Sequence, residues 1–164
     1  MWSDAAGTKG LGAVSIDSYP QQNLQPHPGS TFSITLPPRL SRTQEHINTK
    51  EMGPVEQALL HWGKIWKGKR LICQVDNRAV FHGLEKRTIR GTTMNVLRQC
   101  LLLPTEYDLE TEARWFPTRN NALADAPPRF DYNRIANLAP ELIYPTCNNQ
   151  DHGFLTYNKR DSHQ

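Results

Sequence analysis

One stretch decides the fold that we expect for this chain: Arg70-Leu-Ile-Cys-Gln-Val-Asp76-Asn-Arg-Ala-Val-Phe81. Residues 71–75 form a short apolar run with one Gln, bounded by basic residues before it and a polar pair after it. A run of this length predicts a buried strand of an α/β sheet rather than a helix. Asp76 then stands at the carboxyl end of the strand, where open α/β sheets bind ligands. The alternative is that Asp76 caps the following helix, because Asp and Asn are favoured N-caps.

A long amphipathic helix is predicted before this strand. Its apolar residues follow a helical spacing of three, four and three, backed by Ala58 and Ile65: Met52, Val55, Leu59 and Trp62. Glu51 stands at the start of this helix, where a capping-box-like pair with Asn48 is the alternative to a functional role. Because proline is tolerated only in the first turn of a helix, Gly53-Pro54 predicts a start near residues 48–50.

The chain after the opening stretch is predicted to contain three helices and one strand. They are a short helix at 77–84, a long helix at 92–103, a strand at 109–115 and a short helix at 120–125. The long helix carries Met94, Leu97 and Leu101 on one stripe, and Pro104 is expected to end it. Pro127-Pro128 is expected to cut off the last helix.

The N-terminus is predicted to form a hairpin. Residues 2–16 indicate a strand, a turn and a second strand, and Gly7, Gly10 and Gly12 suit a tight turn and close backbone approach. Asp4 lies near the end of the first strand. Because only three residues precede Asp4, this strand is expected to be short or truncated.

Two segments are expected to lack packed structure. The Pro- and Gln-rich residues 17–30 predict a mobile loop. Residues 131–164 are weakly patterned and predict an irregular or disordered tail.

Residues 31–36 alternate apolar and polar side chains and predict a strand that Pro37 and Pro38 stop. Residues 39–45 predict a polar connection.

Composition limits the class of protein. The 164 residues, 37% of them hydrophobic, fit one globular domain, and the net charge of +3 allows but does not require a nucleic-acid partner. No apolar stretch reaches the roughly 18 residues of a membrane span, and the N-terminus lacks the layout of a signal peptide. Three cysteines without a pairing motif favour a reduced, intracellular protein, cytoplasmic or nuclear. The histidines and cysteines lack the spacing of a zinc site.

Two basic groups flank the opening stretch: Lys64, Lys67, Lys69 and Arg70, then Lys86, Arg87 and Arg90. Basic residues at a helix end usually complement the helix dipole. Contact with phosphate groups is the functional alternative.

Four acids occupy matching positions along the chain, each at or near the end of a predicted element: Asp4, Glu51, Asp76 and Asp125. Such positions are able to meet in one cleft. Four clustered carboxylates would raise one another's pKa unless a cation neutralises them. Carboxylate oxygens suit Mg²⁺ or Mn²⁺, and two such ions about 4 Å apart would promote cleavage of a phosphodiester.

Several segments together resemble a known family. They are Ser-Asp4-Ala-Ala-Gly-Thr-Lys-Gly-Leu-Gly, Phe32-Ser with Pro37, His46-Ile-Asn-Thr-Lys-Glu51-Met, Val75-Asp76-Asn77-Arg-Ala-Val, and Trp115-Phe-Pro with Asn121-Ala-Leu-Ala-Asp125. In this order they resemble the ribonuclease H domain of fungal retrotransposon reverse transcriptases, from elements that also encode a tyrosine recombinase. The resemblance implies an α/β, ribonuclease H-like fold over residues 1–130, with a five-stranded mixed sheet flanked by helices.

The resemblance also implies a function. It is two-metal cleavage of the RNA strand of an RNA–DNA hybrid, with Asp4, Glu51, Asp76 and Asp125 as the catalytic and metal-binding acids and Mg²⁺ or Mn²⁺ as the cofactor. The alternative is an inactive retrotransposon relic that keeps the fold and weak nucleic-acid affinity. Gly53-Pro54 after the helix glutamate and Ala-Pro-Pro-Arg129 after the last acid depart from the family pattern. A proofreading-type exonuclease needs a second acid two residues after the first, and Ala6 stands there.

Overall fold

A five-stranded mixed sheet organises the computed structural model, which describes residues 1–6, 9–15, 31–36, 38–41 and 46–138. Its strands are β1 (Trp2–Ala6), β2 (Gly10–Val14), β3 (Thr31–Thr35), β4 (Arg70–Val75) and β5 (Glu110–Trp115). They lie in the order β3-β2-β1-β4-β5. The pairs β1–β2 and β2–β3 are antiparallel, whereas β4 is parallel to β1 and β5 is parallel to β4.

The connections explain these directions. A short connection joins β1 to β2, as antiparallel neighbours allow, while a parallel neighbour needs a long crossover. The helix α2 (Ile47–Trp62) precedes β4, and α3 (Arg78–Lys86) and α4 (Thr93–Glu106) separate β4 from β5. The architecture expected from the sequence is confirmed: an α/β fold with a five-stranded mixed sheet flanked by helices.

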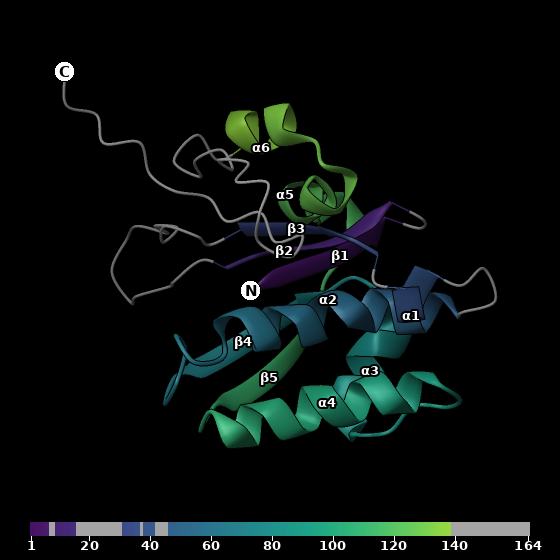
Figure 1. Cartoon of the computed structure of the whole chain (residues 1–164), viewed down its shortest axis with the longest axis vertical. Helices are drawn as coiled ribbons and strands as arrows, with labels where there is room; N and C mark the ends of the chain where they lie inside the picture. Colours follow the sequence, from purple (N-terminus) through teal and green to yellow (C-terminus); the bar gives the residue numbers. More distant parts are fainter. Residues whose placement is uncertain (7–8, 16–30, 37, 42–45, 139–164) are drawn as a thin grey trace.

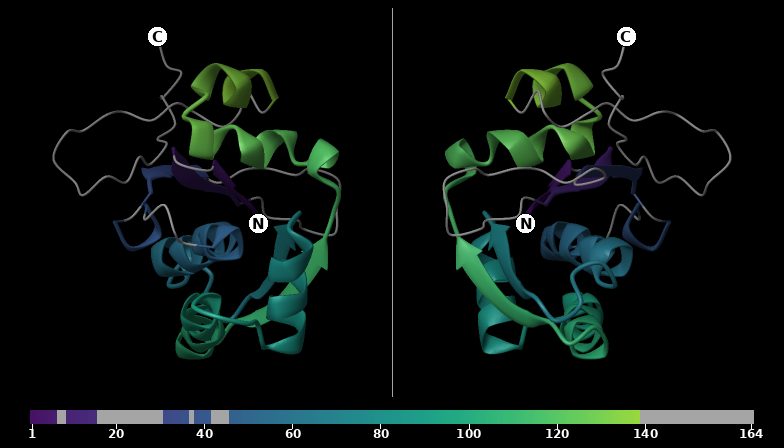
Figure 2. Two further views of the ribbon diagram at one scale, coloured as in Figure 1. Left: turned by 90° about the vertical axis from the view of Figure 1, so that its right-hand side faces the viewer. Right: turned by 90° about the vertical axis from the view of Figure 1, so that its left-hand side faces the viewer.

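Helices cover both faces of the sheet (Figure 1). The helices α2, α3 and α4 enclose one face, and α5 (Ala122–Asp125), η2 (Pro127–Arg129) and α6 (Tyr132–Leu138) lie over the other (Figure 2). Two further short helices are α1 (Pro38–Ser41) and η1 (Thr118–Asn120). In the part of the chain that the structure describes, no helix has the length and apolar character needed to cross a membrane.

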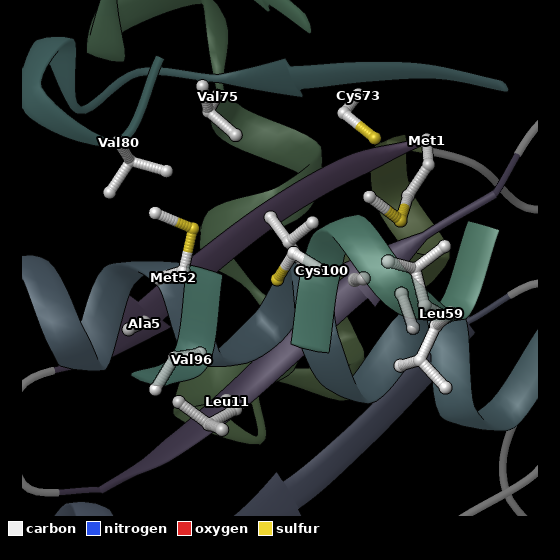
Figure 3. Close-up of a cluster of buried hydrophobic side chains, with 14 of the residues drawn as sticks. Met1, Ala5, Leu11, Met52, Leu59, Cys73, Val75, Val80, Val96 and Cys100 are labelled. Atoms are coloured by element: carbon white, nitrogen blue, oxygen red, sulfur yellow. The ribbon is translucent and has the colours of Figure 1, made fainter. Parts of the chain in front are cut away.

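The larger core lies between the sheet and α2. The predicted stripe of α2 is buried, each residue at most 3% exposed: Met52, Val55, Leu59 and Trp62. Figure 3 shows side chains of this core gathered with Val96 and Cys100 of α4. Ile65, which was expected to extend the stripe, is 67% exposed because α2 ends at Trp62 with Gly63 as its C-cap.

The start of α2 differs from the expected capping pair. His46 is the N-cap, and its Nδ1 accepts the backbone N–H of Asn48 at 3.1 Å. Glu51 therefore does not cap this helix. Pro54 lies inside α2, yet the helix continues to Trp62. Packing of the buried face outweighs the one helix hydrogen bond that proline removes, because tertiary packing supplies most of a helix's stability.

The helix α4 is longer than predicted, and a different face of it is buried. It runs through Pro104 to Glu106. Its buried apolar residues include Val96, Leu97, Cys100 and Leu103, while Met94 and Leu101 are only partly buried. This segment carries two overlapping apolar stripes, so periodicity alone does not select the face that packs.

Two short helices occupy segments for which no helix was predicted. Pro38–Ser41 forms α1, in agreement with the preference of proline for the first helical position. The helix α6 shows that residues 132–138 are not part of an irregular tail, because Ile135 is 1% exposed and packs with Val14 and Ala126. The predicted mobile loop at 17–30 and the rest of the predicted tail, 139–164, lie outside the described residues.

The strand β5 lies at one edge of the sheet, and none of its residues is fully buried. Glu112 accepts hydrogen bonds from Nη2 of Arg70 and from Nε of Arg114, both at 2.6 Å. Nε of Arg70 also lies 3.7 Å from a carboxylate oxygen of Glu110. Charges of both signs therefore line this edge.

Candidate functional site

The parallel strands β1 and β4 bring two acids together. The register of these strands places Trp2 opposite Gln74. Asp4 and Asp76 each lie two residues farther along in the same direction, so the parallel arrangement sets them side by side. Asp4 is buried, at 8% exposed, and Asp76 is partly buried directly after the last residue of β4.

The helix α2 adds a third acid. Glu51 is the fifth residue of α2 and is partly buried. Asp4, Glu51 and Asp76 each offer one carboxylate oxygen, and these three atoms lie within 4.8 Å of one another. Three of the four acids singled out in the sequence therefore meet at one point, each from a different element. We call these three residues the acid cluster.

The interpretation of Asp76 as a helix cap is wrong. Asn77 is the N-cap of α3, because its Oδ1 accepts the backbone N–H of Ala79 at 2.9 Å and that of Val80 at 3.1 Å. The carboxylate of Asp76 does not cap α3 and instead contributes an oxygen to the acid cluster.

Two further hydrogen bonds hold the backbone around Asp76. Nδ2 of Asn77 donates to Oδ1 of Asn48 at 3.3 Å, which ties the end of β4 to the first turn of α2. Nε1 of Trp115, the last residue of β5, donates to the carbonyl oxygen of Asp76 at 2.9 Å. The guanidinium of Arg78 lies 4.6 Å from the centre of the Trp115 ring. These contacts restrain Asp76 relative to the helix that carries Glu51.

Asp125, the fourth acid, lies beside Asp4 but binds arginine side chains. Its carboxylate interacts with that of Asp4 and contributes to the raised pKa of Asp4. Its Oδ1 accepts from Nε of Arg129 at 2.7 Å and its Oδ2 accepts from Nη1 of Arg134 at 2.9 Å. Both carboxylate oxygens of Asp125 are therefore engaged by arginines.

Gly12 allows the segment around Asp125 to approach the sheet. Gly12 lies opposite Asp4 in the β1–β2 pair, and η2 packs against it. A Cβ at this position would lie 2.5 Å from Cβ of Pro127 and 2.6 Å from Cδ of Pro128. The close backbone approach that the sequence predicts at Gly12 thus brings η2, and with it Arg129, over β2.

Gly12→Ala is expected to destabilise the protein by about 1–3 kcal/mol, the usual cost of an overpacked position. The added methyl group would have to push Pro127 and Pro128 off the sheet. Urea unfolding of the two chains measures this loss. Equal stability of Gly12→Ala and the native chain would contradict the packing of η2.

Burial and neighbouring charge raise the pKa values of Asp4 and Glu51. Burial, and then the charge of Asp76, raises the pKa of Asp4 to about 7. Burial, and then the charges of Asp4 and Asp76, raises the pKa of Glu51 to about 8. A backbone hydrogen bond from Ala5 opposes both shifts. Near neutral pH, protons therefore relieve part of the repulsion between these carboxylates.

The residues of the acid cluster fit a divalent metal ion. Their ligand atoms are carboxylate oxygens, which Mg²⁺ and Mn²⁺ prefer. A cation would stabilise the charged forms of Asp4 and Glu51, whose pKa values are raised first by burial and then by the neighbouring acids. Ion binding would then displace protons from these two side chains.

Stability without a metal ion is expected to depend on pH through Glu51. The unfolded chain ionises Glu51 near its ordinary pKa of 4.5, whereas the folded chain keeps the proton until about pH 8. Protonation therefore favours the folded state at low pH, and this contribution is lost as the pH rises through that window. The free energy of unfolding of the native chain, relative to that of Glu51→Gln, should fall by up to about 1.4 kcal/mol per pH unit between about pH 5 and 8. Unfolding in EDTA at a series of pH values measures the difference, and a constant difference would contradict the raised pKa.

Among known proteins, the chain has a distant structural similarity to one solved domain and no matching family model. No protein-family model and no curated protein matches the chain. Among solved structures, the chain is similar to the N-terminal ribonuclease H domain of Rv2228c from Mycobacterium tuberculosis, solved as a fusion with maltose-binding protein. The identity is 13% and the TM-score is 0.49, over 84% of this chain and 93% of that chain.

Several residues that contact the site were given no role at the site from the sequence. Arg129 stands four residues after Asp125, a spacing that favours an ion pair on a helical segment. Asn77 is a favoured N-cap residue next to Asp76, so its capping role was available as a signal. The contacts of Arg134 with Asp125 and of Trp115 with Asp76 have no local sequence signal, because they join different elements.

Proposed function

We propose that this chain is a retroelement-derived ribonuclease H-like domain that cleaves the RNA strand of RNA–DNA hybrids. The observation that carries the proposed activity is the acid cluster, with carboxylate oxygens of Asp4, Glu51 and Asp76 within 4.8 Å of one another. The proposed origin in a retrotransposon reverse transcriptase is supported by the order of the motifs from Asp4 to Asp125. We also propose an intracellular setting, cytoplasmic or nuclear, because the three cysteines have no pairing motif.

In this proposal the acid cluster holds a divalent ion, Mg²⁺ or Mn²⁺. The ion supplies a polarised water molecule and positive charge beside the phosphodiester. The chain itself fixes the positions of the three carboxylates. Asp4 lies on β1, Glu51 lies on α2 and Asp76 directly follows β4. The contacts of Asn77 and Trp115 hold the backbone near Asp76. Pre-set ligands of this kind avoid reorganisation when the substrate binds.

Exposed basic residues near the acid cluster are proposed to bind the phosphate backbone of the hybrid. Arg78 opens α3 next to Asp76 and stacks on Trp115, whose side chain is itself 38% exposed. Lys86 and Arg87 are exposed at the other end of α3. Phosphate contacts made by such residues give affinity without sequence preference. The ion pair of Arg70 with Glu112 favours a structural role for that residue.

One observation favours the alternative of an inactive relic. Both oxygens of Asp125 are engaged by Arg129 and Arg134. If cleavage requires all four acids to hold two ions, these ion pairs oppose it. A relic would keep the fold and a weak, salt-sensitive affinity for nucleic acid through its exposed basic residues.

Cleavage of a labelled RNA–DNA hybrid by the purified chain tests the proposal. We expect cuts in the RNA strand with Mg²⁺ or Mn²⁺ and no cuts with EDTA. Single-stranded RNA and double-stranded DNA of the same sequence are the control substrates. Absence of cleavage under every metal condition, with the hybrid still bound, would support the relic.

A further inference from the structure

Asp125 is neutralised by two arginines that come from different elements. Nε and Nη2 of Arg129, the last residue of η2, both lie 2.7 Å from Oδ1. Nη1 of Arg134, from α6, lies 2.9 Å from Oδ2. Arginine stays protonated in proteins, so these are permanent positive charges. We call Arg129 and Arg134 the arginine pair.

The arginine pair stands at the border of the acid cluster. Gly12, against which η2 packs, lies opposite Asp4 in the β1–β2 pair, and the charge of Asp125 contributes to the raised pKa of Asp4. The side chain of Arg129 is 48% exposed and that of Arg134 is 40% exposed. Both guanidiniums therefore hold Asp125, the acid that interacts with Asp4, and remain within reach of a ligand from solvent.

The segments that carry the arginine pair are anchored to the sheet. The residues before Arg129, Pro127 and Pro128, pack at Gly12. Ile135, the residue after Arg134, is 1% exposed and packs with Val14 of β2. The backbone positions of the two arginines are thus set by the core on this face of the sheet, rather than by a free tail.

We propose that the arginine pair takes the place of a second metal ion. The acid cluster then binds one divalent cation, and the guanidiniums supply the second positive charge beside the substrate phosphate. This inference rests on the proposed function, because it concerns the same site and the same phosphodiester substrate. It departs from the two-ion arrangement that the four acids predict from the sequence.

Charge and hydrogen bonding both support one ion rather than two. A second cation at Asp125 would have to displace the guanidiniums from both carboxylate oxygens. The displaced groups, held nearby by the packing of η2 and α6, would then repel that cation. Guanidinium groups are also well suited to phosphate oxygens, which they bind in bidentate fashion.

The number of bound ions is measured with Mn²⁺ alone as the probe, by calorimetry and by electron paramagnetic resonance. The native chain is titrated free and in complex with a hybrid whose RNA strand carries 2′-O-methyl groups to prevent cleavage. Two ions about 4 Å apart, as in a two-metal site, give a spin-coupled spectrum. A single ion gives an uncoupled one. We expect one ion, uncoupled, in both samples.

Variants of the arginine pair test its role. Arg129→Gln with Arg134→Gln frees Asp125, so we expect a second Mn²⁺ and a coupled spectrum when the hybrid is bound. Arg129→Lys with Arg134→Lys keeps the positive charges and should keep one ion. Arg98→Gln, in an exposed arginine of α4, is the matched control and should also keep one ion. Circular dichroism confirms that each variant is folded.

The outcomes separate this inference from the proposed function. Two coupled ions in the native complex would overturn the inference and leave the proposed nuclease intact. No bound ion in the native chain would overturn both. One ion in the native complex and also one in the double glutamine variant would show that the arginines do not exclude the second ion, which again overturns the inference. The proposal requires one ion in the native complex and two in the double glutamine variant.

Discussion

Asp76→Asn is expected to abolish cleavage of an RNA–DNA hybrid without unfolding the protein. The carboxylate of Asp76 supplies one of the three oxygens of the acid cluster. The amide keeps the size of the side chain but removes the negative charge that attracts the cation. Removal of that charge also relieves repulsion on Asp4 and Glu51, so the metal-free variant should be at least as stable as the native chain.

Metal-dependent stabilisation and activity must be measured together for this variant. Mg²⁺ raises the melting temperature of a protein whose folded state binds it, by mass action. We expect this rise for the native chain, and a much smaller rise for Asp76→Asn. Asp108→Asn is the matched control, because Asp108 is exposed and its φ of 54° suits asparagine equally well. A native chain with neither cleavage nor a Mg²⁺-dependent shift would contradict the proposed nuclease.

Trp62→Ala is expected to cost about 3–5 kcal/mol of stability, as is usual for a buried large aromatic residue. Trp62 is 3% exposed in the core between α2 and the sheet. Its ring centre lies 5.2 Å from that of Phe32 on β3 and 5.3 Å from that of Trp66. The alanine variant would lose these ring contacts and leave a cavity at the end of α2.

Urea unfolding with a common m-value measures the effect of Trp62→Ala. Leu60→Ala, two residues earlier on the exposed side of α2, is the control and should change stability by less than about 1 kcal/mol. A loss below about 1 kcal/mol for Trp62→Ala would contradict the packing of α2 on the sheet.

The elements with strong periodicity were predictable from the sequence. The run before Asp76 forms β4, and the apolar stripe of α2 is buried from Met52 to Trp62. Local signals failed where tertiary packing decides. Pro54 and Pro104 both lie inside helices because burial of an apolar face outweighs the lost backbone hydrogen bond.

The candidate site was only partly predictable, because contacts between distant elements have no local signal in the sequence. The end of β4 was predicted correctly before Asp76, but Asp4, expected near the end of its strand, is the middle residue of β1. The two acids still meet, because the parallel register places them side by side. The engagement of Asp125 by Arg134 depends on α6, which a weakly patterned segment of the sequence did not reveal. A local capping preference favoured Asp76 and Asn77 alike, so only the structure assigns the cap to Asn77.

The charged edge at β5 has a consequence for aggregation. A strand at the edge of a sheet presents unpaired backbone groups to any other extended chain, which is how sheets grow into fibrils. An incoming strand at β5 would have to dehydrate Glu112 together with Arg70 and Arg114, which pair with it. Taking such charges out of water costs more than an exposed ion pair returns. Lateral growth of the sheet is therefore opposed on the side where β5 ends it.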